Sequence, residues 1–130
     1  MGRIYFAEDD EYLTRVYERA FRFAGHEIEI LQDGAKALDA ISKADPLPSV
    51  VILDILLPVM SGFDILTVLR KDPRFDGVPI AILTNSFVEG DREKFLSSGA
   101  DIYMVKIENE PKDVVEKISA LIKIGRVKRS

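Results

Sequence analysis

Acidic, hydroxyl and ammonium side chains follow four short apolar runs of the sequence, at the point where each run ends. They are Glu8, Asp9 and Asp10 after the first run, and Asp54, Thr84 and Lys106 after later ones. A buried carboxylate without a partner is costly, so Asp54, which interrupts the apolar run VVILDILLPVM, needs a chemical reason. Carboxylates that converge repel one another by about 4 kcal/mol per close pair at an effective dielectric constant of about 20. We therefore expect a cation among them.

The chemistry of these side chains favours a hard metal ion and a phosphoryl group. Carboxylate oxygens without His or Cys nearby favour Mg²⁺, which commonly shares its remaining positions with a phosphoryl oxygen. The hydroxyl of Thr84 and the ammonium of Lys106 would then hold other phosphoryl oxygens. Asp54 is the candidate nucleophile, because an aspartate that accepts a phosphoryl group forms an acyl phosphate.

Alternating strands and helices must position these residues. Five short runs alternate with stretches of helical period, which is typical of βα units wound into a parallel sheet. The runs are RIYFA, EIEIL, VVILD, VPIAILT and DIYMVK. We expect Gly25 to end the first helix and Pro111 to open the last one. In an open parallel sheet, ligands bind beyond the carboxyl ends of the strands, so the candidate residues should meet at one edge.

Length and composition indicate one ordinary globular domain. The chain has 130 residues, of which 47% are hydrophobic and 31% are charged, and its net charge of -4 argues against a domain built to bind nucleic acid or an anionic membrane. It has no cysteine, which excludes disulfides and thiolate sites. Neither a signal peptide nor a membrane span is recognisable, so we expect a cytoplasmic protein. We expect the domain to cover residues 1–125, followed by a basic tail or linker stub over 126–130.

Taken together, the motifs resemble the receiver domain of bacterial response regulators. The resemblance covers essentially the whole chain, through IYFAEDD, LDILLPVMSG, ILTNS and GADIYMVK. Its features are an acidic pair after the first strand, an Asp followed four residues later by Pro and eight later by Gly, then a Thr and a Lys. The resemblance implies a doubly wound α/β fold, with a five-stranded parallel sheet in the order 2-1-3-4-5 and five helices on its two faces, the flavodoxin-like arrangement.

The resemblance also implies a metal site. Glu8 and Asp9 would be the metal-binding acidic pair, and Asp54 would be both a metal ligand and the phosphoacceptor. The backbone carbonyl of Leu56 would be a further Mg²⁺ ligand. Mg²⁺ is the cofactor that this family resemblance implies.

The resemblance also implies switch residues, and the chain departs from the family pattern at two positions next to them. Thr84 would be the switch hydroxyl and Lys106 the phosphate-binding lysine, both acting with the phosphoacceptor, while Tyr103 would be the aromatic residue that turns inward after phosphorylation. Family members usually place proline after the lysine, often in a cis peptide, and a small residue after the threonine. Here Ile107 and Asn85 stand at these positions. A cis peptide before a non-proline residue costs about 2.5–4 kcal/mol, so we expect the bond before Ile107 to be trans.

Three other classes of protein share part of this pattern. A flavodoxin-type cofactor protein needs phosphate-cradling residues after the first strand, where AEDD would repel a phosphate. Aspartyl-phosphate hydrolases typically place a second Asp two residues after the first, where this chain has Leu56. A pseudo-receiver keeps the fold and binds partners without being phosphorylated, and Asn85 and Ile107 are the residues that favour it. His26, the single histidine, is expected to be structural, so the chain is not a histidine phosphodonor.

The expected function is that of a signalling switch, catalysing only its own phosphoryl transfer and dephosphorylation. Asp54 would take the phosphoryl group from a phosphohistidine of a sensor histidine kinase or phosphotransfer protein. The signal would leave through the surface of the fourth helix, fifth strand and fifth helix, toward a downstream protein, an attached output domain or a phosphorylation-dependent dimer. No contact of this domain alone with nucleic acid or membrane is expected.

Overall fold

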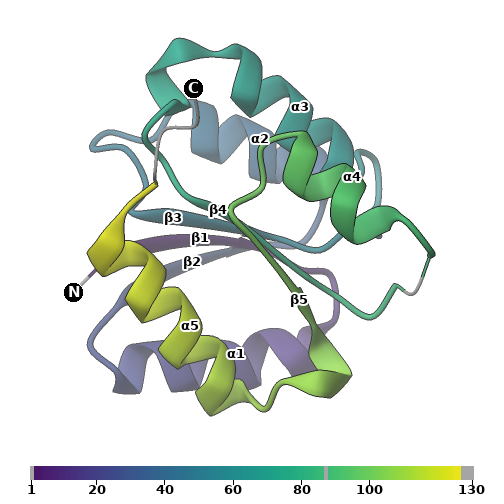
Figure 1. Cartoon of the computed structure of the whole chain (residues 1–130). Helices are drawn as coiled ribbons and strands as arrows, with labels where there is room; N and C mark the ends of the chain where they lie inside the picture. The colour runs from purple at the N-terminus through teal and green to yellow at the C-terminus, as the bar shows by residue number, and fades with distance from the viewer. Residues whose placement is uncertain (1, 87, 127–130) are drawn as a thin grey trace.

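One parallel sheet of five strands, in the spatial order β2-β1-β3-β4-β5, organises the chain as predicted (Figure 1). The computed structural model describes residues 2–86 and 88–126. The strands are β1 (Arg3–Ala7), β2 (Glu27–Leu31), β3 (Val50–Leu53), β4 (Ile80–Thr84) and β5 (Ile102–Val105). The helices are α1 (Glu11–Phe23), α2 (Gly34–Ser42), α3 (Gly62–Lys71), α4 (Asp91–Ser97) and α5 (Pro111–Ile124), with two 3-10 turns, η1 (Pro73–Phe75) and η2 (Lys106–Glu108).

The five helices cover the sheet on two faces. Figure 1 shows α1 and α5 on one face and α2, α3 and α4 on the other. Each face has its own apolar core, because alternate residues of a strand point to opposite sides. In β1, Tyr5 belongs to the core under α2, α3 and α4, whereas Ile4 and Phe6 belong to the core under α1 and α5. All residues of the central strand β3 are buried, which explains its unbroken apolar sequence.

Local signals in the sequence set the helix ends. Asp10 caps α1, since its side chain accepts a hydrogen bond from the Leu13 N–H at 3.1 Å. Gly25 follows α1 with a φ of 92°, the left-handed conformation that glycine adopts most readily, as predicted. Pro111 opens α5, also as predicted, beside a reciprocal capping box between Glu110 and Asp113.

Partly buried polar contacts lie at the amino ends of the strands, opposite the candidate site. Asp101, just before β5, accepts hydrogen bonds from the Ile80 N–H at 2.8 Å, from Arg70 at 3.0 Å and from Arg126 at 3.2 Å. Arg126, the first residue of the predicted tail, is therefore bound to the domain. The boundary after residue 125 stays a prediction, and residues 127–130 lie outside the described part of the chain.

His26 also lies at this opposite edge, where it links the chain start to α5. Its Nδ1 accepts a hydrogen bond from the Gly2 N–H at 3.1 Å, and its Nε2 lies 2.9 Å from the Ser119 hydroxyl. The ring is buried and packs edge-on against Phe21. The structural role predicted for this residue agrees with these contacts.

Over residues 2–86 and 88–126, no helix combines the length and apolar character needed to cross a bilayer.

Candidate functional site

Three carboxylates meet where neighbouring strands β1 and β3 end. Glu8 and Asp9 follow β1 and Asp54 follows β3, and one oxygen of each lies within 4.8 Å of the others. The pairing of Ala7 with Leu53 in the parallel register places the acidic pair beside Asp54. Glu8 and Asp54 are 1% and 6% exposed, whereas Asp9 is open to solvent. The predicted convergence of these side chains is therefore present in the structure.

Lys106 supplies a cation to this cluster from the end of β5. Its ammonium donates to Asp54 Oδ2 at 2.8 Å and to a carboxylate oxygen of Glu8. Burial alone would lower the pKa of Lys106, but the hydrogen bonds to Asp54 and Glu8 outweigh that effect and raise it. Burial raises the pKa of Glu8, and the contact with Lys106 partly opposes the rise. The ammonium is thus held charged between the two buried carboxylates.

The loop after β3 fixes the other oxygen of Asp54. The Leu56 N–H donates to Asp54 Oδ1 at 3.3 Å, and the Gly62 N–H donates to the Ile55 carbonyl at 3.0 Å. A Cβ on Gly62 would lie 2.1 Å from the Asp54 carbonyl oxygen, closer than real Cβ contacts. Glycine eight residues after Asp54 is therefore required by the close approach of α3 to this loop. Leu56 itself is 70% exposed, and its carbonyl as a metal ligand stays a prediction.

Thr84 ends β4, the strand between β3 and β5. Its side chain is buried, and its Oγ1 accepts a hydrogen bond from the Ser86 N–H at 3.2 Å. The hydroxyl proton remains able to donate to an acceptor beyond the strand end. Thr84 thus lies at the end of a strand, where we expected the switch hydroxyl. Its role as a switch stays a prediction.

Tyr103 lies in β5, three residues before Lys106, with its side chain 7% exposed. Its ring centroid is 5.9 Å from that of Phe95 in α4, and its carbonyl accepts a hydrogen bond from Arg92 at 3.2 Å. The inward packing that we expected to follow phosphorylation is the packing found in this structure. The Phe95 contact gives the ring this apolar site, and a change of rotamer upon phosphorylation stays a prediction.

Asn85 and Ile107, treated above as two separate departures from the family pattern, are bonded to each other. The Ile107 N–H donates to Asn85 Oδ1 at 3.1 Å. The peptide bond between Lys106 and Ile107 is trans, as predicted, and the cis bond found among the described residues precedes Pro46. A signal for the contact was present in the sequence: replacing a proline restores a backbone donor, and Asn offers an acceptor.

The donor set fits a hard divalent cation. Glu8, Asp9 and Asp54 offer only oxygen atoms, the ligands that Mg²⁺ and Ca²⁺ prefer, without the imidazole or thiolate typical of zinc sites. Asp9 is the exposed member, so it faces the side from which a hydrated ion would enter. The cluster thus offers oxygen ligands of the kind that a hydrated divalent ion prefers, with the Lys106 ammonium beside them.

Comparison with known proteins decides the family. The sequence profile of the response regulator receiver domain matches residues 4–119. The chain belongs to this family. The receiver fold predicted from the sequence is confirmed by both the match and the strand order.

Curated relatives of the receiver are longer proteins. The chain is 36% identical over 121 residues to the DNA-binding response regulator MtrA of Mycolicibacterium smegmatis, covering 93% of this chain and 50% of that protein. It is 35% identical over 104 residues to the response regulator MprA of a Mycobacterium species (strain KMS), covering 80% of this chain and 44% of that protein. The receiver chain thus spans about half the length of the curated relatives it matches.

Solved receiver structures share the whole fold. A LuxR-family DNA-binding response regulator from Staphylococcus aureus is 27% identical with a TM-score of 0.84, covering 94% of this chain and 99% of that chain. The chemotaxis response regulator CheY4 of Vibrio cholerae is 25% identical with a TM-score of 0.83, covering 93% and 98%. The receiver domain of Francisella response regulator 1452 has a TM-score of 0.86 at 23% identity, covering 95% and 98%, and supports the fold.

Proposed function

We propose that this receiver accepts a phosphoryl group on Asp54 from a phosphohistidine of a sensor histidine kinase or phosphotransfer protein, with Mg²⁺, and that the modification changes partner binding. The observation that carries the proposal is the buried Asp54 carboxylate held by Lys106 beside two further carboxylates. A purely structural ion pair would not need the additional like charges of Glu8 and Asp9, which destabilise the fold at this position.

The transfer is a displacement at phosphorus. An Asp54 oxygen forms the new P–O bond while the P–N bond to the donor imidazole breaks and its electron pair returns to the ring nitrogen. Lys106 balances negative charge on Asp54 and on the phosphoryl oxygens, and Thr84 donates its hydroxyl proton to one of those oxygens. Mg²⁺, held by Glu8, Asp9, Asp54 and the Leu56 carbonyl, would neutralise phosphoryl charge during transfer.

Intact mass spectrometry tests this assignment. Acetyl phosphate with Mg²⁺ should add about 80 Da, the mass of one phosphoryl group, and peptide mapping should locate it on Asp54. Asp54→Asn should abolish the addition, whereas Asp39→Asn, which removes an exposed α2 carboxylate paired with Lys43, should leave it intact. Phosphorylation of the Asp54→Asn variant to the wild-type extent would refute the assignment.

The alternative is a pseudo-receiver that binds partners without phosphorylation. Asn85 and Ile107 favour it, since both stand beside the site at positions where the family usually has other residues. Absence of added mass from both acetyl phosphate and a cognate kinase would favour this alternative.

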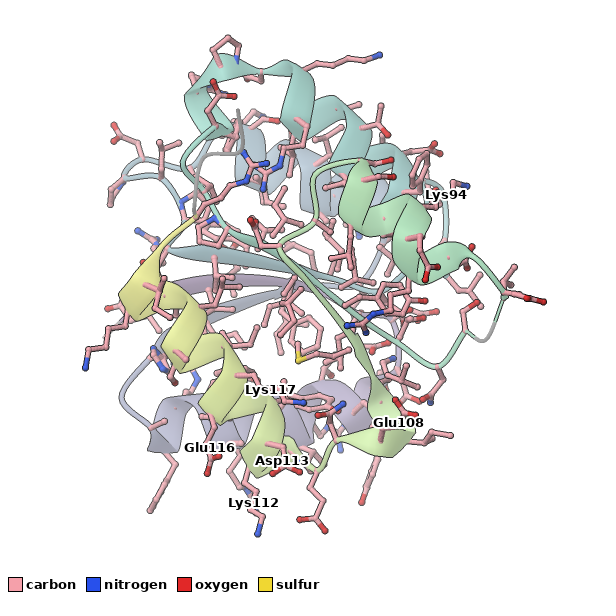
Figure 2. All side chains as sticks on the ribbon, in the orientation of Figure 1. Lys94, Glu108, Lys112, Asp113, Glu116 and Lys117 are labelled. Carbon is pink, nitrogen blue, oxygen red and sulfur yellow. The ribbon has the colours of Figure 1, made fainter. Side chains whose placement is uncertain are left out.

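Output is proposed to pass through α4, β5 and α5. The groove between α4 and the end of β5 is lined by charges of both signs, Arg92 and Glu108 among them, and Figure 2 shows Glu108 on η2 and Asp113 and Lys117 near the start of α5. Charges of both signs suit a polar contact with a downstream protein, an attached output domain or a second copy of the chain. The similarity to MtrA, a DNA-binding response regulator of which this chain covers half, supports an attached output domain. We also propose a cytoplasmic location, and no direct contact of this domain with nucleic acid or membrane.

A further inference from the structure

The hydrogen bond between Asn85 and Ile107 joins the two loops that flank the phosphoacceptor. Asn85 directly follows Thr84 at the end of β4, and Ile107 directly follows Lys106 at the end of β5. The 3.1 Å contact therefore connects residues that are each one peptide bond from a side chain of the site. Both residues are exposed, so apolar burial does not explain why they meet.

The turn that carries Lys106 is short and weakly packed. It comprises only the three residues of η2, and the Ile107 side chain is 71% exposed. Its backbone is held by hydrogen bonds: Asn109 N–H donates to the Lys106 carbonyl at 3.2 Å, and Asn109 Nδ2 donates to the Val105 carbonyl at 2.9 Å. These two bonds stay within the turn and β5. Of these three hydrogen bonds, the Ile107–Asn85 bond is the one that connects the turn to the neighbouring loop after β4.

We propose that Asn85 is a positioning residue for Lys106: by accepting the Ile107 N–H, it holds the backbone from which the ammonium reaches Asp54 and couples η2 to the loop after Thr84. Its effect on phosphoryl transfer rests on the proposed function, whereas its effect on the resting site does not. Movement of the Thr84 loop toward a phosphoryl group would be passed through Asn85 to η2 and then to the start of α5.

The Ile107 amide reports whether the bond exists in solution. Asn85→Leu has similar size without an acceptor, and Asn85→Asp keeps an acceptor oxygen. We expect Asn85→Leu to speed hydrogen exchange of the Ile107 amide by about threefold to tenfold and to shift its proton signal upfield, while Asn85→Asp keeps both near wild type. Unchanged exchange and shift in Asn85→Leu would overturn the proposal.

The NMR signal of the Lys106 ammonium reports whether Asn85 positions this side chain. If the bond only stabilised the loop, its loss would leave that signal unchanged. In ¹H–¹⁵N spectra of the protein without phosphodonor, Asn85→Leu should move or broaden the Lys106 ammonium resonance, because its contact with Asp54 loosens. Asn85→Asp should restore the resonance to a defined position. A wild-type ammonium signal in Asn85→Leu, alongside a freed Ile107 amide, would also overturn the proposal, since the bond would then exist without positioning Lys106.

A double-mutant cycle separates this proposal from the phosphotransfer proposal. Ile107→Pro removes the donor, so Asn85 loses its partner. In the wild-type background, Asn85→Ala should slow phosphorylation by acetyl phosphate about threefold or more, but in the Ile107→Pro background it should change the rate little. Equal slowing in both backgrounds would contradict the coupling. If the wild type takes no phosphoryl group from any donor, the proposed function fails, and the ammonium and amide signals still decide the role of Asn85.

Discussion

Lys106 and Asp54 form a buried ion pair, with Lys106 Nζ 2.8 Å from Asp54 Oδ2, at the edge where three carboxylates converge. The same ammonium binds Glu8, so one cation of the protein serves two carboxylates. We expected a cation among these acidic groups on electrostatic grounds alone. The structure shows that a lysine from the far side of β4 provides part of that charge, and Asp9 remains outside the pairing as the exposed acidic group.

Replacing Asp54 with Asn should stabilise the protein in the absence of divalent metal. The change removes repulsion from both Glu8 and Asp9 at the cost of one attraction to Lys106, and the amide oxygen can still accept from the ammonium. We expect a gain of ~1 kcal/mol in unfolding free energy, measured by urea denaturation with chelator present. Mg²⁺ at about ten times its dissociation constant should stabilise wild type by ~1.4 kcal/mol and Asp54→Asn much less.

Glu29→Gln is the matched control for that charge change, because Glu29 is an exposed carboxylate of the edge strand β2. It should change neither the baseline stability nor the response to Mg²⁺ appreciably. If neither millimolar Mg²⁺ nor the Asp54→Asn substitution changes the melting temperature, the electrostatic account is wrong.

Gly62→Ala should destabilise the fold and disturb the phosphoacceptor loop. The added Cβ would lie 2.1 Å from the Asp54 carbonyl oxygen, a backbone atom that cannot rotate away. We expect a loss of about 2–3 kcal/mol in unfolding free energy, as is typical when a close backbone contact is overpacked. Gly77→Ala is the control, since no atom lies within 4 Å of its Cβ position and its φ is not positive. Equal stabilities of the two variants would contradict the close approach.

The convergence of the site residues could be predicted from the sequence because it depends on topology alone. Parallel strands bring their carboxyl ends to one edge, so residues after β1, β3, β4 and β5 meet there whatever their distances along the chain. Glu8, Asp54 and Lys106 obey this rule, and the apolar run around β3 already indicated a central strand. The individual contacts of Lys106 could not be predicted, since a flexible side chain selects its partners by local geometry.

Two contacts near the site join residues of different elements and depend on how those elements pack together. Asn85 and Ile107 are 22 residues apart, and their bond follows from the register of β4 against β5 together with the shape of η2. The buried position of Tyr103 follows from its packing against Phe95 of α4. Both features are tertiary: Asn85 and Ile107 offer a matching acceptor and donor in the sequence, but only the fold determines that they meet.

A phosphoryl group on Asp54 should decay slowly because Leu56 offers the hydrolytic water no hydrogen bond. Leu56 stands two residues after the acceptor and is largely exposed, so it can be replaced without disturbing the core. Leu56→Asn should shorten the half-life about fivefold, if the new hydrogen bond contributes ~1 kcal/mol to the transition state. Leu56→Met, which is also apolar, should retain the slow decay in a time course by intact mass. Identical half-lives in all three proteins would exclude this role for Leu56.

Stability should fall as the pH drops below the ordinary pKa of histidine. Burial lowers the pKa of His26, and the Gly2 N–H donates to Nδ1, the atom that protonation would occupy. The unfolded state therefore binds a proton first as the pH falls below about 6.5, and stability from this residue is lost in that direction. His26→Gln should remove this component, so wild type should lose more unfolding free energy than the variant between about pH 7 and about pH 5. Parallel pH profiles would show that His26 does not titrate in folding.

The hydroxyl of Thr84 should couple the phosphoryl group to the surface formed by α4, β5 and α5. Because Thr84 Oγ1 accepts from the Ser86 N–H, a turn of the hydroxyl toward a phosphoryl oxygen should change the Ser86 amide signal most. The ring of Tyr103 is already packed on Phe95, so its signals should change less than in a protein whose tyrosine moves in from solvent. Beryllofluoride, a mimic of the acyl phosphate, permits this measurement by NMR.

Thr84→Ala and Thr84→Ser form the decisive pair for this coupling. Both substitutions remove the γ-methyl group, but only serine keeps the hydroxyl, so beryllofluoride should still shift the signals of α4 and α5 in Thr84→Ser and largely fail to do so in Thr84→Ala. Tyr103→Ala tests the next step, since it removes the contact with Phe95 and should loosen α4 with or without the mimic. The Asp54 region should respond to beryllofluoride in every variant, which shows that the mimic has bound. If Thr84→Ala then gives the wild-type shifts in α4 and α5, the signal leaves the site without the threonine.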